Sequence, residues 1–174
     1  GVTFWFGVLL LGGISFIWEP LPLPPSLQQL PFFRSLHPLG VVFLLLVTAY
    51  LLFSALRTTP LKIRAWELPV PPLKLAIAQV VLSSLDWILA AGVLYVLLPA
   101  IDSLSYAQFL SVFILAQIAG VSSQLPGGLG VFETVVLLFL SPRLPTPAIL
   151  GALVAYRGIY YLLPLGVATV LLAM

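Results

Sequence analysis

Residues 75–98 read LAIAQVVLSSLDWILAAGVLYVLL, an apolar run in which Asp86 is the one charged residue. Gln79, Ser83 and Asp86 follow the i, i+4, i+7 spacing of one helix face, so they form a polar stripe that is expected to face the bundle interior. A transmembrane helix needs about 20 predominantly apolar residues to cross the hydrocarbon core of a bilayer, and this run is long enough. The other runs lie at about 1–18, 38–56, 107–124, 131–140 and 147–174. Pro164 is expected to kink or break the helix of the run 147–174. Together they predict an all-α protein, a polytopic bundle of transmembrane helices.

The composition agrees with a chain whose solvent is lipid. Hydrophobic residues make up 61% of the 174 residues and charged residues 7%, whereas soluble domains carry about 25% charged residues. With no cysteine and one histidine, His37, the sequence predicts neither a disulfide nor a zinc site, and no metal or cofactor is expected. The net charge of +2 rests on seven basic residues, and it indicates topology rather than nucleic-acid binding.

The connections between the runs differ in charge. Residues 57–74 hold four basic residues against the single carboxylate of Glu67. Because Lys and Arg concentrate in cytoplasmic loops, this connection is expected inside, and those at 19–37 and 99–106 outside. The connection 19–37 is rich in proline, leucine and phenylalanine, and we expect it to lie at the membrane interface.

The run 131–140 is too short to cross a hydrocarbon core of about 30 Å at 1.5 Å per residue. It follows the glycine-rich sequence LPGGLG at 125–130, so a re-entrant or broken helix is expected here. Such backbone survives at membrane depth only where protein or a water-filled cavity surrounds it. Gln117, Gly120 and Gln124 lie on one face of the preceding helix. That face either leads a ligand toward the break or packs closely on another helix.

Three ionisable residues lie within apolar runs. Asp86 lies about 18 Å along its helix from Lys74, and Arg157 about 16 Å from Thr146, so both are near mid-membrane. Glu133 lies in the first turn of the short helix, where the helix dipole favours a carboxylate. A charge at the bilayer centre costs about 3 kcal/mol, so each of these groups needs a partner or a role.

Two interpretations of these charges remain open. In the first, Asp86 or Glu133 pairs with Arg157 as a structural bridge. In the second, all three line a polar cavity where Arg157 meets an anionic group of a lipid or solute. Backbone N–H groups of residues 127–130 would then receive a phosphate or carboxylate. Likewise, Tyr156, Tyr160 and Tyr161 are interpreted either as packing residues or as residues that stack on a ligand.

Three motifs resemble the membrane domain of the lysylphosphatidylglycerol synthase/flippase family, which includes the multiple peptide resistance factor. They are LPGGLGVFE at 125–133, AYRGIYYLLPLG at 155–166 and SSLDWILAAGVLYVLLP at 83–99. The resemblance covers roughly residues 60–174. Because the family domain is longer and this sequence starts at Gly1, the chain resembles the C-terminal portion of a single membrane domain whose N-terminal helices are missing.

The resemblance implies a helical membrane domain with re-entrant elements that moves aminoacylated or other phospholipids between leaflets. Aminoacyl transfer belongs, in the family, to a separate soluble domain that nothing in this chain resembles, so we expect no enzymatic activity and no catalytic residue here. The family's lipid pathway would carry its charges at the positions of Asp86, Glu133 and Arg157. We add the residues of the break to give the expected substrate-binding set: Asp86, Glu133, Arg157, Gly127, Gly128, Gly130 and Gln124.

Our hypothesis is therefore a multi-pass, flippase-like protein of the bacterial plasma (inner) membrane that acts on phospholipid or a lipid-linked precursor. The alternatives are the membrane portion of a lipid-modifying synthase or transferase, and a small-solute secondary transporter, for which broken helices and buried charges serve equally well. Expected partners are membrane phospholipid, a second copy of the chain, and a soluble synthase or transferase domain.

Overall fold

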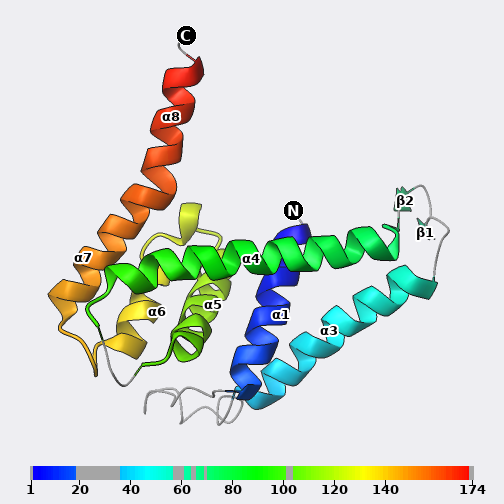
Figure 1. Ribbon diagram of the computed structural model, residues 1–174, viewed down its shortest axis with the longest axis horizontal. Helices are drawn as coiled ribbons and strands as arrows, with labels where there is room; N and C mark the ends of the chain where they lie inside the picture. The colour runs from blue at the N-terminus through cyan, green and yellow to red at the C-terminus, as the bar shows by residue number, and fades with distance from the viewer. Residues whose placement is uncertain are drawn as a thin grey trace. The chain divides into compact units, whose positions relative to one another are not determined.

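The computed structural model describes residues 2–18, 36–56, 61–63, 66–68, 70–100 and 104–172. The proline-rich segment expected at the membrane interface falls on residues 19–35, outside the described residues. Figure 1 shows the helices in chain order: α1 (Val2–Trp18), α3 (His37–Leu56), α4 (Leu73–Leu97), α5 (Tyr106–Ser122), α6 (Val131–Leu140), α7 (Thr146–Arg157) and α8 (Leu163–Leu172). A 3-10 turn, η2 (Pro126–Gly128), precedes α6, and a π-helical turn, η3 (Gly158–Leu162), joins α7 to α8.

The expected fold class, a helical membrane bundle with a broken helix, is confirmed. A small departure lies in the connection after α3, where β1 (Leu61–Ile63) and β2 (Trp66–Leu68) form an antiparallel pair. The register places Lys62 opposite Glu67. Two three-residue strands form a local hairpin and do not change the fold class.

Three helices within the described ranges are long and apolar enough to cross a membrane. They are His37–Leu56, Leu73–Leu97 and the continuous helical segment Thr146–Leu172. The apolar helices Thr3–Trp18, Tyr106–Ser122 and Pro126–Leu140 are shorter. The bounds of α6 match the short run predicted at 131–140, which confirms that this element is a half-length helix.

The chain divides into two compact units, and the boundary falls inside α4. Of the described residues, the first unit comprises those up to Trp87, and the second comprises those from Ile88 onward. The single membrane domain expected over residues 1–174 stays a prediction.

In the first unit, glycines let α1 and α3 approach closely. A Cβ atom placed on Gly40 would lie 2.9 Å from the side chain of Ile17 and 3.0 Å from the Gly13 carbonyl oxygen. Small residues at a helix crossing increase van der Waals contact, which is a main source of helix association in lipid. Phe6 of α1 stacks on Tyr50 of α3, with 4.0 Å between the ring centroids.

Polar side chains of α4 join it to the other two helices of this unit. The Gly7 N–H donates to Ser83 Oγ at 2.9 Å, and the Trp87 indole N–H donates to the Phe4 carbonyl at 3.1 Å. Tyr50 donates its hydroxyl proton to Gln79 Oε1 at 2.6 Å. Gln79 and Ser83 thus face other helices, as their helical spacing predicts.

The core of the second unit forms around α5, which begins at the N-cap Ser105. Phe109, Phe113 and Ile114 of this helix are fully buried. The aromatic packing continues from Phe113 to Phe132 of α6 and Tyr156 of α7. Helix α8 differs, because all of its described residues are exposed.

We expected a kink or a break at Pro164. The helix remains continuous across this residue, so a break is absent. The disturbance is the π-helical turn η3, in which the N–H of Leu163 donates to the Gly158 carbonyl five residues earlier. Proline has no N–H to give the carbonyl four residues before it. A local change to i→i+5 hydrogen bonding is one of the ways in which a helix accommodates such a loss.

We predict that Gly40→Ala destabilises the first unit, because the added methyl group meets Ile17 and the Gly13 backbone. Overpacking of this kind costs about 1–3 kcal/mol, which would appear as a lower midpoint of thermal unfolding in detergent. The matched control is Gly151→Ala on α7, where an added Cβ has no described atom within 4 Å. Equal midpoints for the two variants would contradict the close approach of α1 and α3.

Candidate functional site

The break between α5 and α6 is built from left-handed backbone. Gly127, Gly128 and Gly130 have φ angles of 64°, 61° and 82°. Glycine adopts such angles without the steric cost that other residues meet, so the glycine spacing explains the broken helix. Gln124 has a φ of 56°, follows the last residues of α5, and ends that helix in the left-handed position.

Two of the expected site residues, Gln124 and Gly128, have structural roles. Gln124 is exposed and terminates α5. Gly128 is buried against α5, and a Cβ atom on it would lie 2.9 Å from the Cα atom of Gly120. The small-residue interpretation of Gly120 thus agrees with the structure, because it allows the backbone of the break to touch that of α5. A ligand-binding role for Gln124 and Gly128 stays a prediction.

Three backbone N–H groups of the break already have acceptors. Gly128 N–H donates to the Leu125 carbonyl at 2.9 Å, and Leu129 N–H to the Pro126 carbonyl at 3.4 Å. Gly130 N–H donates to Glu133 Oε2 at 2.8 Å. These groups would have to release their present acceptors before they could hold a phosphate or carboxylate.

Glu133 connects the start of α6 to the end of α7. It occupies the third position of α6 and caps the helix through Gly130 N–H, where the helix dipole also favours a negative charge. Its Oε1 atom lies 2.5 Å from both Nε and Nη2 of Arg157. About a fifth of each side chain is exposed, 22% for Arg157 and 19% for Glu133.

Arg157 has two further partners. Both of its terminal nitrogens lie 3.4 Å from the Gly127 carbonyl oxygen, and its guanidinium carbon lies 5.5 Å from the centre of the Tyr161 ring. The spacing of Arg157 and Tyr161, i and i+4 on one helix face, was a signal for this cation–π contact. From the sequence, Tyr161 is interpreted only as a packing or stacking residue.

Aromatic residues next to the ion pair set its position. Phe132 directly precedes Glu133 in the sequence, and Tyr156 directly precedes Arg157. The rings of Phe132 and Tyr156 stack at a centroid distance of 6.2 Å, with their planes 18° apart. Tyr156 also meets Phe113 edge-on at 6.1 Å, and it is only 2% exposed. This packing holds α6 and α7 in the register that brings the two charges together.

Asp86 belongs to the first unit and is exposed on α4. It forms no ion pair within the residues that the structure describes. Within the second unit the carboxylate that pairs with Arg157 is Glu133, and Gly127 and Gly130 contact this pair through their backbone atoms. The role of Asp86 in a lipid pathway stays a prediction.

The arrangement leaves one edge of the Arg157 guanidinium weakly occupied. Glu133 occupies the Nε–Nη2 edge, while the Gly127 carbonyl contacts the Nη1–Nη2 edge at a distance long for a hydrogen bond. A phosphate or carboxylate can bind the Nη1–Nη2 edge in place of this carbonyl, because two parallel charge-assisted bonds can form there. The described residues contain no group of three His, Asp or Glu residues that could hold a metal ion.

Comparison with known proteins gives partial matches. No family model matches the chain. The protein slr0712 of Synechocystis sp. is 49% identical over 97% of this chain and 52% of its own length. Inner membrane protein YbhN of Escherichia coli is 33% identical over 97% of this chain and 52% of its own length. Phosphatidylglycerol lysyltransferase of Staphylococcus haemolyticus is 40% identical over 51% of this chain and 11% of its own length.

The chain spans about half the length of the first two relatives. The lysyltransferase match confirms the resemblance noted in the sequence. Together with the three long apolar helices, the match to an inner membrane protein identifies the chain as a membrane protein.

We predict that the two charges of the pair depend on each other. Glu133→Gln or Arg157→Gln alone leaves a partly buried charge without its partner, at a cost of about 1–3 kcal/mol. The double variant should lose less stability than the sum of the two single variants, measured by thermal unfolding in detergent. Additive losses would mean that the two side chains do not interact.

We also predict that Gly128→Ala is more harmful than Gly127→Ala. Both place an alanine at a φ angle slightly above 60°, at a cost of about 1–2 kcal/mol, but only Gly128 presses against the backbone of Gly120. An added Cβ on Gly127 has an ordinary contact of 3.6 Å to Arg157 Nη1. The midpoints of thermal unfolding check the order, and a lower midpoint for Gly127→Ala would contradict the close contact at Gly128.

Proposed function

Because the chain is homologous to YbhN and, over about half of its length, to the membrane portion of staphylococcal phosphatidylglycerol lysyltransferase, we propose that it moves phospholipid between leaflets of a bacterial inner membrane. The lipid is an aminoacylated phosphatidylglycerol-like molecule or a lipid-linked precursor. The protein acts as a multi-pass, flippase-like carrier, and transport is passive or coupled to an ion.

The observation that carries this proposal is the position of the Glu133–Arg157 pair. Arg157 lies about 16 Å into the long helical segment that begins at Thr146, which is near the middle of a bilayer if the segment spans it. A charge at that depth is costly and is usually functional. Here the pair lies beside a broken helix and both side chains are partly exposed, so a headgroup can reach them.

In the proposed mechanism the headgroup phosphate binds the Nη1–Nη2 edge of Arg157 and displaces the weak contact to the Gly127 carbonyl. As Arg157 turns toward the phosphate, the carboxylate of Glu133 becomes available to a cationic part of the headgroup. For a headgroup with one phosphate and one ammonium group, this exchange brings equal and opposite charges to the site, so no net charge is added at mid-membrane. Asp86 is proposed to balance charge elsewhere on the same pathway.

We predict that Arg157→Ala abolishes lipid movement by the full-length protein in vesicles. The assay follows a fluorescent phospholipid whose outer-leaflet copies are reduced chemically, so that the protected fraction reports movement between leaflets. Arg157→Lys is the control that retains the charge but loses the two-bond geometry; it should retain part of the activity. Equal scrambling by wild type and Arg157→Ala, with both shown to be folded, would refute the proposal.

The similarity to the staphylococcal phosphatidylglycerol lysyltransferases suggests a second candidate function. The chain would then be the membrane portion of a lipid-modifying enzyme whose catalytic domain lies elsewhere. The match covers 11% of those lysyltransferases, so it assigns no enzymatic role to this chain. Product analysis of membrane lipids after expression of the full-length protein separates the candidates, since a new aminoacylated lipid requires the enzyme.

A further inference from the structure

One nitrogen of Arg157, the terminal Nη2 atom, contacts two oxygen acceptors from different elements. It lies 2.5 Å from Oε1 of Glu133, in α6, and 3.4 Å from the carbonyl oxygen of Gly127, in the turn η2. A carboxylate and a carbonyl are therefore close enough together for one nitrogen to reach both. In the proposed mechanism Arg157 turns toward a phosphate, and both acceptors then lose this donor.

Both acceptors are held in place by contacts that do not involve Arg157. Glu133 also accepts from the N–H of Gly130 at 2.8 Å. Gly127 lies in left-handed backbone, with a φ of 64°, and the next residue, Gly128, is packed against α5. When Arg157 leaves, the two oxygens remain as a preformed pair, and polar groups in lipid surroundings need a partner.

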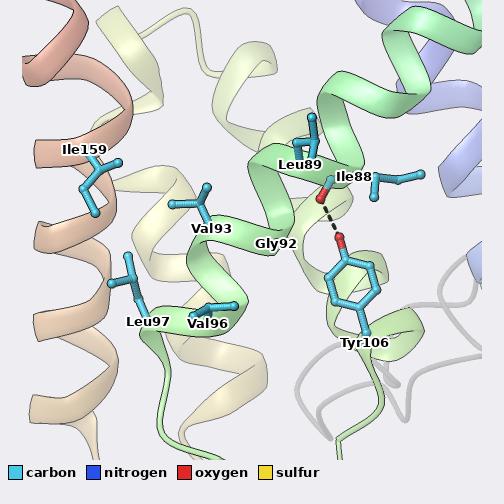
Figure 2. Close-up of a pocket in the computed structure, with 8 residues that line it drawn as sticks. All are labelled: Ile88, Leu89, Gly92, Val93, Val96, Leu97, Tyr106 and Ile159. Carbon is cyan, nitrogen blue, oxygen red and sulfur yellow. Dashed lines mark hydrogen bonds between the residues drawn. The ribbon is translucent and has the colours of Figure 1, made fainter.

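The π-helical turn that follows Arg157 faces an apolar groove. Figure 2 shows Ile159 of this turn across the groove from α4. Among the described residues that line the groove, Tyr106 alone has a polar side chain, and its hydroxyl donates to the Ile88 carbonyl at 2.6 Å. A cation beside Arg157 is therefore attracted to the pair of oxygens and not to this groove.

We propose that the position of Nη2 receives the primary ammonium group of a phospholipid headgroup, while Arg157 holds the phosphate of the same lipid. The inference rests on the proposed function for the place of the phosphate, and it adds the headgroup that the site selects. A primary ammonium has three N–H donors, so it can donate to Glu133 and Gly127 together. It also carries the positive charge that strengthens a hydrogen bond to a carboxylate.

The same chemistry selects against two other headgroups. A trimethylammonium group has no N–H donor and is typically bound within a cage of aromatic rings, whereas the Tyr161 ring already lies against Arg157. A glycerol headgroup has hydroxyl donors but no positive charge for Glu133. The substrate class is therefore an aminophospholipid, a lipid that carries both a phosphate and a primary amine.

The test measures binding, so it does not depend on the transport assay. Full-length protein in detergent is mixed with equal amounts of phosphatidylethanolamine and its mono-, di- and trimethylated forms, all with the same acyl chains. Native mass spectrometry then gives the fraction of protein bound to each lipid. The four lipids keep the same charge while the number of N–H donors falls from three to none. Because the site has two acceptors, binding should be similar for the first two lipids, fall several-fold at the dimethylated form, and fall further at the trimethylated form.

Glu133→Gln removes the charge of the carboxylate, and a glutamine at this position can still cap the helix. This variant should reduce the preference for phosphatidylethanolamine over its trimethylated form several-fold. Glu67→Gln is the matched control, because it removes the same charge in strand β2 of the first unit. The control should retain the preference of the wild type.

Equal binding of all four lipids to the wild type would overturn the proposal, and so would an unchanged preference in Glu133→Gln. If Glu133→Gln does not fold, the methylation series on the wild type decides the outcome. A binding preference without lipid movement in vesicles would contradict the flippase proposal alone. Lipid movement without a headgroup preference would contradict the present proposal alone.

Discussion

The carboxylate of Glu133 is the group on which the site depends, because it satisfies two different needs of a broken helix in lipid. Backbone polar groups at membrane depth have no water to bond, so each must find a partner inside the protein. Glu133 accepts from the N–H of Gly130 at the start of α6 and from Arg157 at the end of α7. One side chain thereby caps a half-length helix and neutralises a partly buried cation.

The glycines make this geometry accessible. Three of them hold left-handed backbone, which lets residues 125–130 turn back within a short distance and keep their own hydrogen bonds. Gly128 and Gly120 then bring the break against α5 with backbone touching backbone. The stacked rings of Phe132 and Tyr156 complete the arrangement, since each ring is one residue before a member of the ion pair.

Much of this could be predicted from local sequence, and the remainder depends on how helices are rotated against each other. The glycine spacing and the length of the run at 131–140 predict the broken helix and its bounds. The helical stripe of α4 correctly places Gln79 and Ser83 against neighbouring helices, yet Asp86 on the same stripe is exposed. Spacing along a helix gives depth but not the neighbour at that depth, so it could not choose between Asp86 and Glu133 as the partner of Arg157. Pro164 likewise predicts a disturbance without its form, because a missing N–H can be accommodated by a kink or by a π-helical turn.

The other contacts of Glu133 and Arg157 explain how this ion pair can be both a structural bridge and a binding site. If Arg157 turns away, Glu133 still accepts from Gly130 N–H, and its charge still lies at the positive end of the α6 dipole. Arg157 lies over the ring of Tyr161, which belongs to the same helical segment as Arg157, and so it also keeps a contact. Each charge thus retains one favourable contact when the pair opens, and opening costs less than separating two charges that have no other partner. A pair with this construction is stable when closed and can open at a low cost, which is the property that the proposed lipid pathway requires.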